Sequence, residues 1–213
     1  MLAIIDYGMG NLRSIANAFL ALGCQVLVTR AATDLEAADA IVLPGVGAFE
    51  DGMRRLRELG MIEALSRQVL DRRKPYLGVC LGMQFLASES HEHGVTKGLG
   101  WLPGTVERIV PEGGAFKVPH IGWNDVEVVG FGPLFRDLAP RPVFYFVHSY
   151  HLRPVPESAH LVTSRCWHGT DVVASVSLGH IHGVQFHPEK SQAAGLKLLR
   201  NFLDSCAHEA PHA

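Results

Sequence analysis

Two short motifs, separated by about half of the 213-residue chain, carry the residue types of a covalent acyl-transfer site. Gly-Val-Cys-Leu-Gly at residues 78–82 offers a thiol, and Gly-Val-Gln-Phe-His-Pro-Glu at residues 183–189 offers an imidazole and a carboxylate. Such chemistry needs a nucleophile, a base and a group that orients the base. Cys80, His187 and Glu189 are therefore the candidate catalytic residues.

The residues around Cys80 predict a strand that turns sharply into a helix. Residues 75–79 read as a short apolar strand, and residues 81–88 have the apolar spacing of a helix. A glycine two residues away on each side is typical of a nucleophile elbow. The helix N-terminus favours a thiolate, and the N–H of Leu81 is a candidate oxyanion donor. The alternative, a buried structural cysteine, does not account for the glycine frame.

His187 is expected to leave the C-terminal end of a strand over residues 181–186. Pro188 disfavours helical backbone at the residue before it, so His187 is held extended. Residues i and i+2 of an extended chain point to the same side, which places Glu189 beside His187. The carboxylate can then hold one ring nitrogen and leave the other for the thiol. An ordinary surface loop is the alternative for this segment taken alone.

A third element follows a buried strand over residues 40–43. In Pro-Gly-Val-Gly, residues 44–47, two glycines let the backbone rotate, so that an N–H of Val46 or Gly47 can face a developing oxyanion. A phosphate loop is disfavoured, because Glu50 stands at the third glycine of a dinucleotide fingerprint and no Gly-Lys-Ser/Thr follows.

The candidate triad resembles that of the class I (triad) glutamine amidotransferases. Within that class, further motifs resemble the glutaminase subunits of imidazole glycerol phosphate synthase, over about residues 1–205 and in the order of that family. These motifs are Asp-Tyr-Gly-Met-Gly-Asn-Leu (6–12), Leu-Pro-Gly-Val-Gly-Ala-Phe (43–49), Pro-His-Ile-Gly-Trp-Asn (119–124), Tyr-Phe-Val-His-Ser-Tyr (145–150) and residues 183–191.

The resemblance implies hydrolysis of glutamine through a cysteinyl thioester, with ammonia delivered to a cyclase subunit in a heterodimer. The cyclase would make imidazole glycerol phosphate and AICAR nucleotide in histidine biosynthesis, and no cofactor is implied. Glutamine would contact Gly45, Gln84, Glu92 (or Glu89 instead), His148, Ser149 and Tyr150. The docking face would include Asn11, Pro119, His120, Gly122, Trp123 and Asn124.

Composition and length restrict the possible partners, cellular compartment, metal sites and number of domains. The formal net charge of −2 suggests neither nucleic acid nor an anionic membrane as a partner, and no apolar run could span a bilayer. The four cysteines have no paired spacing, which favours a reducing cytoplasm. The twelve histidines show no metal-ligand pattern, so we expect no metal site. The length fits one domain over residues 1–206, followed by a frayed tail at 207–213.

The expected fold class is α/β, with a central, mostly parallel sheet flanked by helices and an added mixed or antiparallel portion in the second half. Strands are expected at residues 2–6, 25–29, 40–43, 76–79, 104–110, 125–129, 143–148, 161–165, 172–177 and 181–186. Helices are expected at residues 12–22, 33–38, 53–70 with a break near 60, and from a Ser191 cap to about 205.

Two other functions stay open at this point. The chain could be a glutaminase that feeds another synthase, such as the pyridoxal phosphate one, although the motifs at 119–124 and 145–150 argue against this. It could also be a non-catalytic binding module on the same scaffold. A broken triad would indicate such a module, and here all three members are present.

Overall fold

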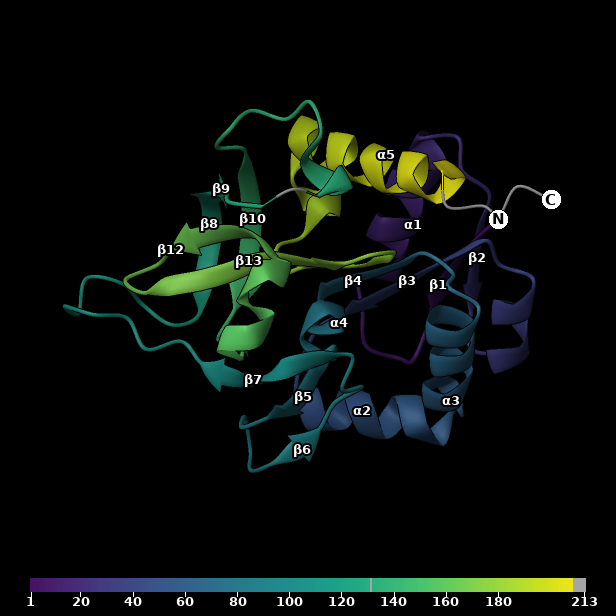
Figure 1. Ribbon diagram of the computed structural model, residues 1–213, viewed down its shortest axis with the longest axis horizontal. Helices are drawn as coiled ribbons and strands as arrows, with labels where there is room; N and C mark the ends of the chain where they lie inside the picture. Colours follow the sequence, from purple (N-terminus) through teal and green to yellow (C-terminus); the bar gives the residue numbers. More distant parts are fainter. Residues whose placement is uncertain (131, 209–213) are drawn as a thin grey trace.

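A large sheet forms the centre of the computed structural model, which describes residues 1–130 and 132–208 (Figure 1). Its strands are, in spatial order, β2 (Val26–Thr29), β1 (Leu2–Ile5), β3 (Ala40–Gly45), β4 (Tyr76–Cys80), β14 (Ile181–Val184), β13 (Asp171–Leu178), β12 (Val162–Trp167) and β9 (Glu127–Val128). The strands from β2 to β14 are parallel, and β13, β12 and β9 continue the sheet with antiparallel pairings. The expected fold class is confirmed.

Helices cover both faces of this sheet (Figure 1). α1 (Leu12–Ala21) and α5 (Gln192–His208) lie on one face, and α2 (Phe49–Glu58) and α3 (Met61–Ser66) lie on the other. The parallel strands are apolar at nearly every position because alternate side chains enter two separate cores. In β1, Ile5 packs in the core of α2 and α3, whereas Ile4 packs in the core of α1 and α5.

Two smaller sheets complete the fold. One contains β11 (Tyr150–Pro154), β7 (Leu102–Arg108), β5 (Ala87–Ser90) and β6 (Thr96–Lys97), and the other pairs β10 (Val143–His148) with β8 (His120–Asp125). Short helical segments are α4 (Leu81–Gln84), η1 (Ala32–Glu36), η2 (Arg67–Asp71), η3 (Pro133–Phe135), η4 (Pro156–Leu161) and η5 (Pro188–Lys190). The single strand expected at 125–129 is therefore wrong in its bounds, since β8 ends at Asp125 and a separate strand, β9, covers only Glu127–Val128.

The helix expected at residues 81–88 is shorter in the structure. α4 ends at Gln84, and the chain continues into β5. The carbonyls of Phe85 and Leu86 accept hydrogen bonds from the N–H groups of Leu99 and Leu102. Pairing with a distant segment thus overrides the local helical spacing. A second strand that the sequence did not predict, β11, pairs with β7 and ends at Pro154, where a proline is tolerated at a strand edge.

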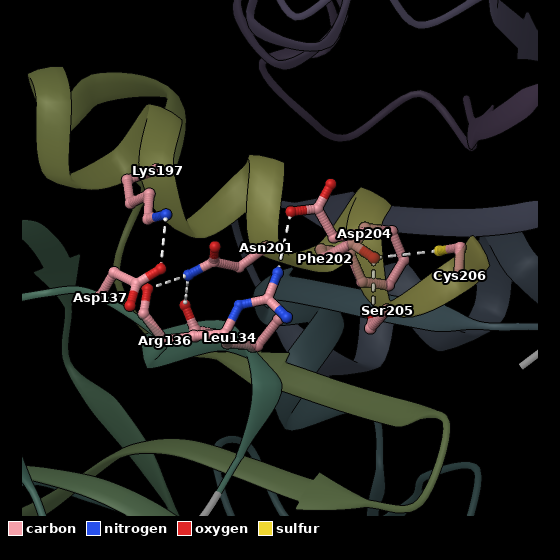
Figure 2. A network of polar contacts seen from close by, with 9 residues as sticks. All are labelled: Leu134, Arg136, Asp137, Lys197, Asn201, Phe202, Asp204, Ser205 and Cys206. Atoms are coloured by element: carbon pink, nitrogen blue, oxygen red, sulfur yellow. Dashed lines mark hydrogen bonds and ion pairs between the residues drawn. The ribbon is translucent and has the colours of Figure 1, made fainter. Parts of the chain in front are cut away.

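Helix α5 holds the segment that leads into β10 (Figure 2). The Asn201 side-chain amide donates to the carbonyls of Leu134 and Arg136, at 2.9 and 2.7 Å. Arg136 also pairs with Asp204 at 2.9 Å. These contacts fasten the η3 segment to the last helix, and β10 follows it with residues that the candidate site uses.

The C-terminal predictions have mixed outcomes. α5 extends to His208, beyond the expected end at 205, and residues 209–213 of the predicted frayed tail lie outside the described residues. Ser191 precedes the helix, but its hydroxyl donates to the His187 carbonyl at 2.6 Å and accepts from the Tyr145 N–H at 3.0 Å. Within the described ranges, no helix combines the length and apolar character that a bilayer-spanning segment needs.

Candidate active site

Cys80 lies where β4 meets α4, in a backbone conformation that L-residues rarely adopt. Its φ is 55° and its ψ is −109°. Such a conformation costs about 1–3 kcal/mol and persists only where the surroundings hold it. Two glycines provide those surroundings: a Cβ on Gly82 would overlap the Leu43 carbonyl oxygen, and one on Gly78 would overlap the Gly82 carbonyl. The sharp turn that the sequence predicts at Cys80 is confirmed.

His187 and Glu189 meet three residues beyond the end of β14, the strand beside β4 in the sheet. His187 Nδ1 lies 2.9 Å from Glu189 Oε1, and the two side chains are only 3% and 2% exposed. His187 has extended backbone before Pro188, as expected. Its other nitrogen, Nε2, is buried with no hydrogen-bond partner among the described residues, so it remains available for the thiol.

The electrostatics of His187 favour a charged ring. Burial by itself would lower the pKa, but the Cys80 sulfur and the Glu189 carboxylate together raise the pKa of His187 to about 10. The ring is therefore an imidazolium at neutral pH, with a proton to give to a leaving group.

Backbone contacts hold the His187 loop in place. The His187 N–H donates to the Tyr145 carbonyl at 2.8 Å, and the Ser191 hydroxyl donates to the His187 carbonyl. Because the same hydroxyl accepts from the Tyr145 N–H, Ser191 joins the loop to β10 at two points. The sequence suggested a helix cap at Ser191, whereas the hydroxyl serves the loop that carries the imidazole.

A cavity of about 330 Å³ opens beside the sulfur, within the range typical of small-molecule sites. It is lined by Val46, Gly47, Cys80, Leu81, Gln84, Glu92, Pro119, Val147, His148, Ser149 and Tyr150. All of these except Val147 and Pro119 were predicted as catalytic, oxyanion or substrate residues, and Pro119 was predicted as a docking residue. Gly45, also predicted, is not among the lining residues. It is opposite Cys80 in the β3–β4 register, and a Cβ there would overlap the Tyr7 hydroxyl.

Two glutamates competed for one predicted contact, and the structure separates them. Glu92 lines the cavity, and its Oε2 accepts from the Phe49 N–H at 2.7 Å. Glu89 pairs instead with His91 at 2.9 Å, and both of those side chains are more than a third exposed. The arrangement favours Glu92 as the substrate contact.

Gln84 and His148 line the cavity with most of their hydrogen-bonding groups already in use. Gln84 Nε2 donates to the Tyr150 carbonyl at 2.9 Å and to Gln185 Oε1 at 3.0 Å, which leaves its Oε1 as an acceptor. His148 Nδ1 contacts the Tyr150 carbonyl at 2.8 Å, and Nε2 contacts His120 Nδ1 at 3.0 Å. The His148 ring therefore has no free donor for a substrate carboxylate.

The predicted docking residues divide into exposed and buried groups. On β8, Ile121 and Trp123 are 60% and 50% exposed, whereas His120 is only 3% exposed. The expectation of His120 at a surface contact needs correction, because its side chain points inward to His148. Asn124 is partly buried and donates to His120 and to the Trp167 carbonyl. Pro119 is exposed, and Asn11 and Gly122 are partly buried.

The sequence reasoning missed two residues of interest. Gln185 is completely buried, and its Nε2 lies 3.6 Å from Cys80 Sγ. It stands inside the second motif, two residues before His187, and this period-2 spacing was the signal that could have found it. Ile121 was passed over inside the third motif, although its alternation with His120 marks it as outward-facing.

The fold and this thiol–imidazole–carboxylate arrangement define a class, the class I glutamine amidotransferases. The family model described as glutamine amidotransferase class-I matches residues 3–206. A solved structure described as a glutamine amidotransferase has a TM-score of 0.74 at 23% identity, and the match covers 96% of this chain and 98% of that one. At that identity the structural match supports the fold alone.

Sequence relatives narrow the class to one kind of subunit. Imidazole glycerol phosphate synthase subunit HisH of Methanothermobacter thermautotrophicus is 50% identical over 204 residues, which cover 96% of this chain and 98% of the relative. Subunit HisH 1 of Campylobacter jejuni is 45% identical over 203 residues, covering 95% of this chain and 99% of the relative. The chain belongs to the HisH family of imidazole glycerol phosphate synthase subunits.

Proposed function

We propose that this chain hydrolyses glutamine to glutamate and ammonia through Cys80. The ammonia passes to the cyclase subunit of imidazole glycerol phosphate synthase, which makes imidazole glycerol phosphate and AICAR nucleotide in histidine biosynthesis. The observation that carries this proposal is the buried contact of 2.9 Å between His187 and Glu189, next to a cavity that Cys80 lines. The two subunits form a heterodimer in the cytoplasm, and the glutaminase needs no cofactor or metal.

In the first step, Cys80 Sγ attacks the side-chain carbonyl carbon of glutamine. The oxyanion is met by the N–H of Leu81 and by an N–H from Val46 or Gly47, which line the same cavity. His187 then gives a proton to the amide nitrogen, and the carbon–nitrogen bond breaks to release ammonia. The products of this step are ammonia and a glutamyl thioester on Cys80.

Water completes the reaction. His187, now neutral, takes a proton from the water as its oxygen attacks the thioester carbon. The carbon–sulfur bond breaks, and glutamate leaves as the sulfur is restored. Glu189 keeps the ring in the tautomer that presents Nε2 to these protons and stabilises the positive charge that His187 gains.

Substrate binding follows from the polar atoms that remain free in the cavity. Gln84 Oε1 and the second carboxylate oxygen of Glu92 are acceptors, which suit the α-ammonium group of glutamine. Ser149 and the backbone of residues 148–150 receive the α-carboxylate. The His148 ring supports them by holding the Tyr150 carbonyl.

The docking face for the cyclase subunit includes Asn11, Pro119, Gly122, Trp123 and Asn124. Ile121 belongs with them, because it is the most exposed apolar side chain on β8. Large apolar side chains on an exposed strand are typical of an interaction surface. The docking face lies close to the active-site cavity, since Pro119 also lines that cavity beside Cys80.

The test is to measure glutamine hydrolysis by the chain alone and with the cyclase subunit and its substrate. We expect little activity alone and strong stimulation by the partner, with both lost in Cys80→Ala. An electrophilic glutamine analogue should label Cys80. Labelling of Cys24 or Cys166 instead, or full activity without the partner, would contradict the proposal.

A further inference from the structure

A line of hydrogen bonds begins at the surface of β8 and leads inward to buried side chains. Asn124 Nδ2 lies 3.0 Å from the Trp167 carbonyl and 3.2 Å from His120 Nε2. His120 Nδ1 lies 3.0 Å from His148 Nε2, and His148 Nδ1 lies 2.8 Å from the Tyr150 carbonyl. Five side-chain and backbone groups from β8, β10, β11 and β12 are thus joined without a gap.

The chemistry of these groups fixes the direction of every bond. The Tyr150 carbonyl only accepts, so His148 Nδ1 carries a hydrogen. Burial lowers the pKa of His148 to about 3 and that of His120 to about 4, so both rings are neutral. A neutral ring has one donor and one acceptor, so His148 Nε2 accepts from His120 Nδ1, and His120 Nε2 accepts from Asn124.

The line continues from Tyr150 to the nucleophile through two glutamines. Gln84 Nε2 donates to the Tyr150 carbonyl at 2.9 Å and to Gln185 Oε1 at 3.0 Å. With its oxygen engaged by Gln84, the Gln185 amide presents Nε2 to Cys80 Sγ at 3.6 Å. Gln84 and Gln185 are 5% and 0% exposed, so the bond between these two side chains is shielded from water.

We propose that Gln185 positions the Cys80 sulfur through its amide N–H, and that the hydrogen bonds from β8 fix the orientation of that amide. The inference rests on the proposed function, because it takes Cys80 as the nucleophile. A glutamine amide can flip by half a turn. The flipped form would place its oxygen against the sulfur and repel an anion there.

The Tyr150 carbonyl can only accept, so it determines that the Gln84 amide turns its NH2 end toward β11. The His148 N–H donates to the same carbonyl and holds it in place. Gln84 in turn can meet only the oxygen of Gln185. Because Asn124 and His120 belong to the strand proposed to dock the partner, contacts made on β8 reach the sulfur through this line.

The test measures alkylation of Cys80 by iodoacetamide in the full-length chain, without glutamine or partner. The Cys80 peptide is quantified by mass spectrometry, with the partly exposed Cys24 as an internal reference. Gln185→Met removes the donor at similar volume. Since a hydrogen bond to an anion favours the thiolate, we expect Cys80 alkylation to slow about tenfold or more while the Cys24 rate is unchanged.

A second pair of variants tests the remote end and does not depend on the folding of Gln185→Met. His120→Phe keeps the ring stacking on Phe146 and His168 but removes both hydrogen bonds, and we expect alkylation to slow about threefold. His120→Asn supplies a donor near the Nδ1 position and should restore most of the rate. The matched control is His182→Phe, a buried histidine bonded to Ser177 outside this line.

The outcomes separate this proposal from the proposed function. A wild-type alkylation rate in Gln185→Met, or in His120→Phe, would overturn the proposal. So would equal slowing in the His182→Phe control, because the effect would then be general loosening. If the variants behave as expected but the wild-type chain with its partner hydrolyses no glutamine, the proposed function fails and the positioning of the sulfur stands.

Discussion

The Glu189 carboxylate offers the sharpest test of the proposed triad. It is 2% exposed and lies 2.9 Å from His187 Nδ1, while its second oxygen has no hydrogen-bond partner among the described residues. Glu189→Gln keeps the shape and an acceptor oxygen for the ring but removes the negative charge. The change therefore tests the charge rather than the packing.

The expected loss follows from that contact. A hydrogen bond to a charged group contributes about 1.5–3 kcal/mol. If that contribution is made mainly to the charged ring in the transition state, kcat should fall about 10- to 150-fold. The pKa of His187, which Glu189 helps to raise to about 10, should fall in Glu189→Gln. His187→Ala should lose more, because it removes the base itself.

The assay is partner-stimulated glutamine hydrolysis, with Lys190→Ala as the neighbouring control. A second readout uses the pH dependence of unfolding. Because folding raises the pKa of His187 above 6.5, its stabilising effect is present below pH 6.5 and is lost as the pH rises through about 10. Glu189→Gln should lose less stability over that window. Equal activity in Glu189→Gln and Lys190→Ala would remove Glu189 from the mechanism.

Three further expectations concern other parts of the molecule. Trp123→Ala should change the free energy of unfolding by less than about 0.5 kcal/mol, because the side chain is half exposed. The same change should weaken binding of the cyclase at least tenfold in calorimetric titration. Unchanged affinity would count against docking on β8. Gly47 has a φ of 95°, and a Cβ added there would lie 2.9 Å from Met9 Cε. Gly47→Ala should therefore lower partner-stimulated activity about tenfold while binding of the partner is retained. Normal stimulation in this variant would refute a role for the Gly47 peptide. Burial lowers the pKa of His182 to about 4, so its neutral form stabilises the fold above pH 6.5 and that effect is lost as the pH falls toward 4. The loss of unfolding free energy between pH 7 and pH 5 should be about 2 kcal/mol smaller in His182→Gln than in the wild type, and identical losses would refute this role of His182.

Local sequence rules predicted the parts of the site that the backbone alone determines. The glycines around Cys80 and the proline after His187 each restrict one or two residues, and the structure has the expected sharp turn and extended segment there. The parallel strands were predictable for a similar reason, because burial on both faces makes their sequences continuously apolar.

The features that the sequence did not predict depend on partners far away in the chain. β5 forms where a helix was expected because the carbonyls of Phe85 and Leu86 accept hydrogen bonds from the N–H groups of Leu99 and Leu102. β11 forms because it pairs with β7. The position of Gln185, two residues before His187, could place its side chain on the same side as the imidazole, but not its role, since that role depends on Gln84, 101 residues earlier, which engages its oxygen. Tertiary pairing of this kind has no local pattern from which it can be inferred.

The two sides of strand β8 face different surroundings, one exposed and the other hydrogen-bonded within the protein. In a strand, alternate residues face opposite sides. Ile121 and Trp123 point outward with at least half of their surface exposed, whereas His120 and Asn124 point inward into the hydrogen-bonded line that ends at Cys80. A movement of β8 by one partner contact would therefore shift the inward residues as well. If both proposals hold, the strand that binds the cyclase is also the strand whose hydrogen bonds lead to the Cys80 sulfur, and docking and reactivity are then coupled through β8 itself.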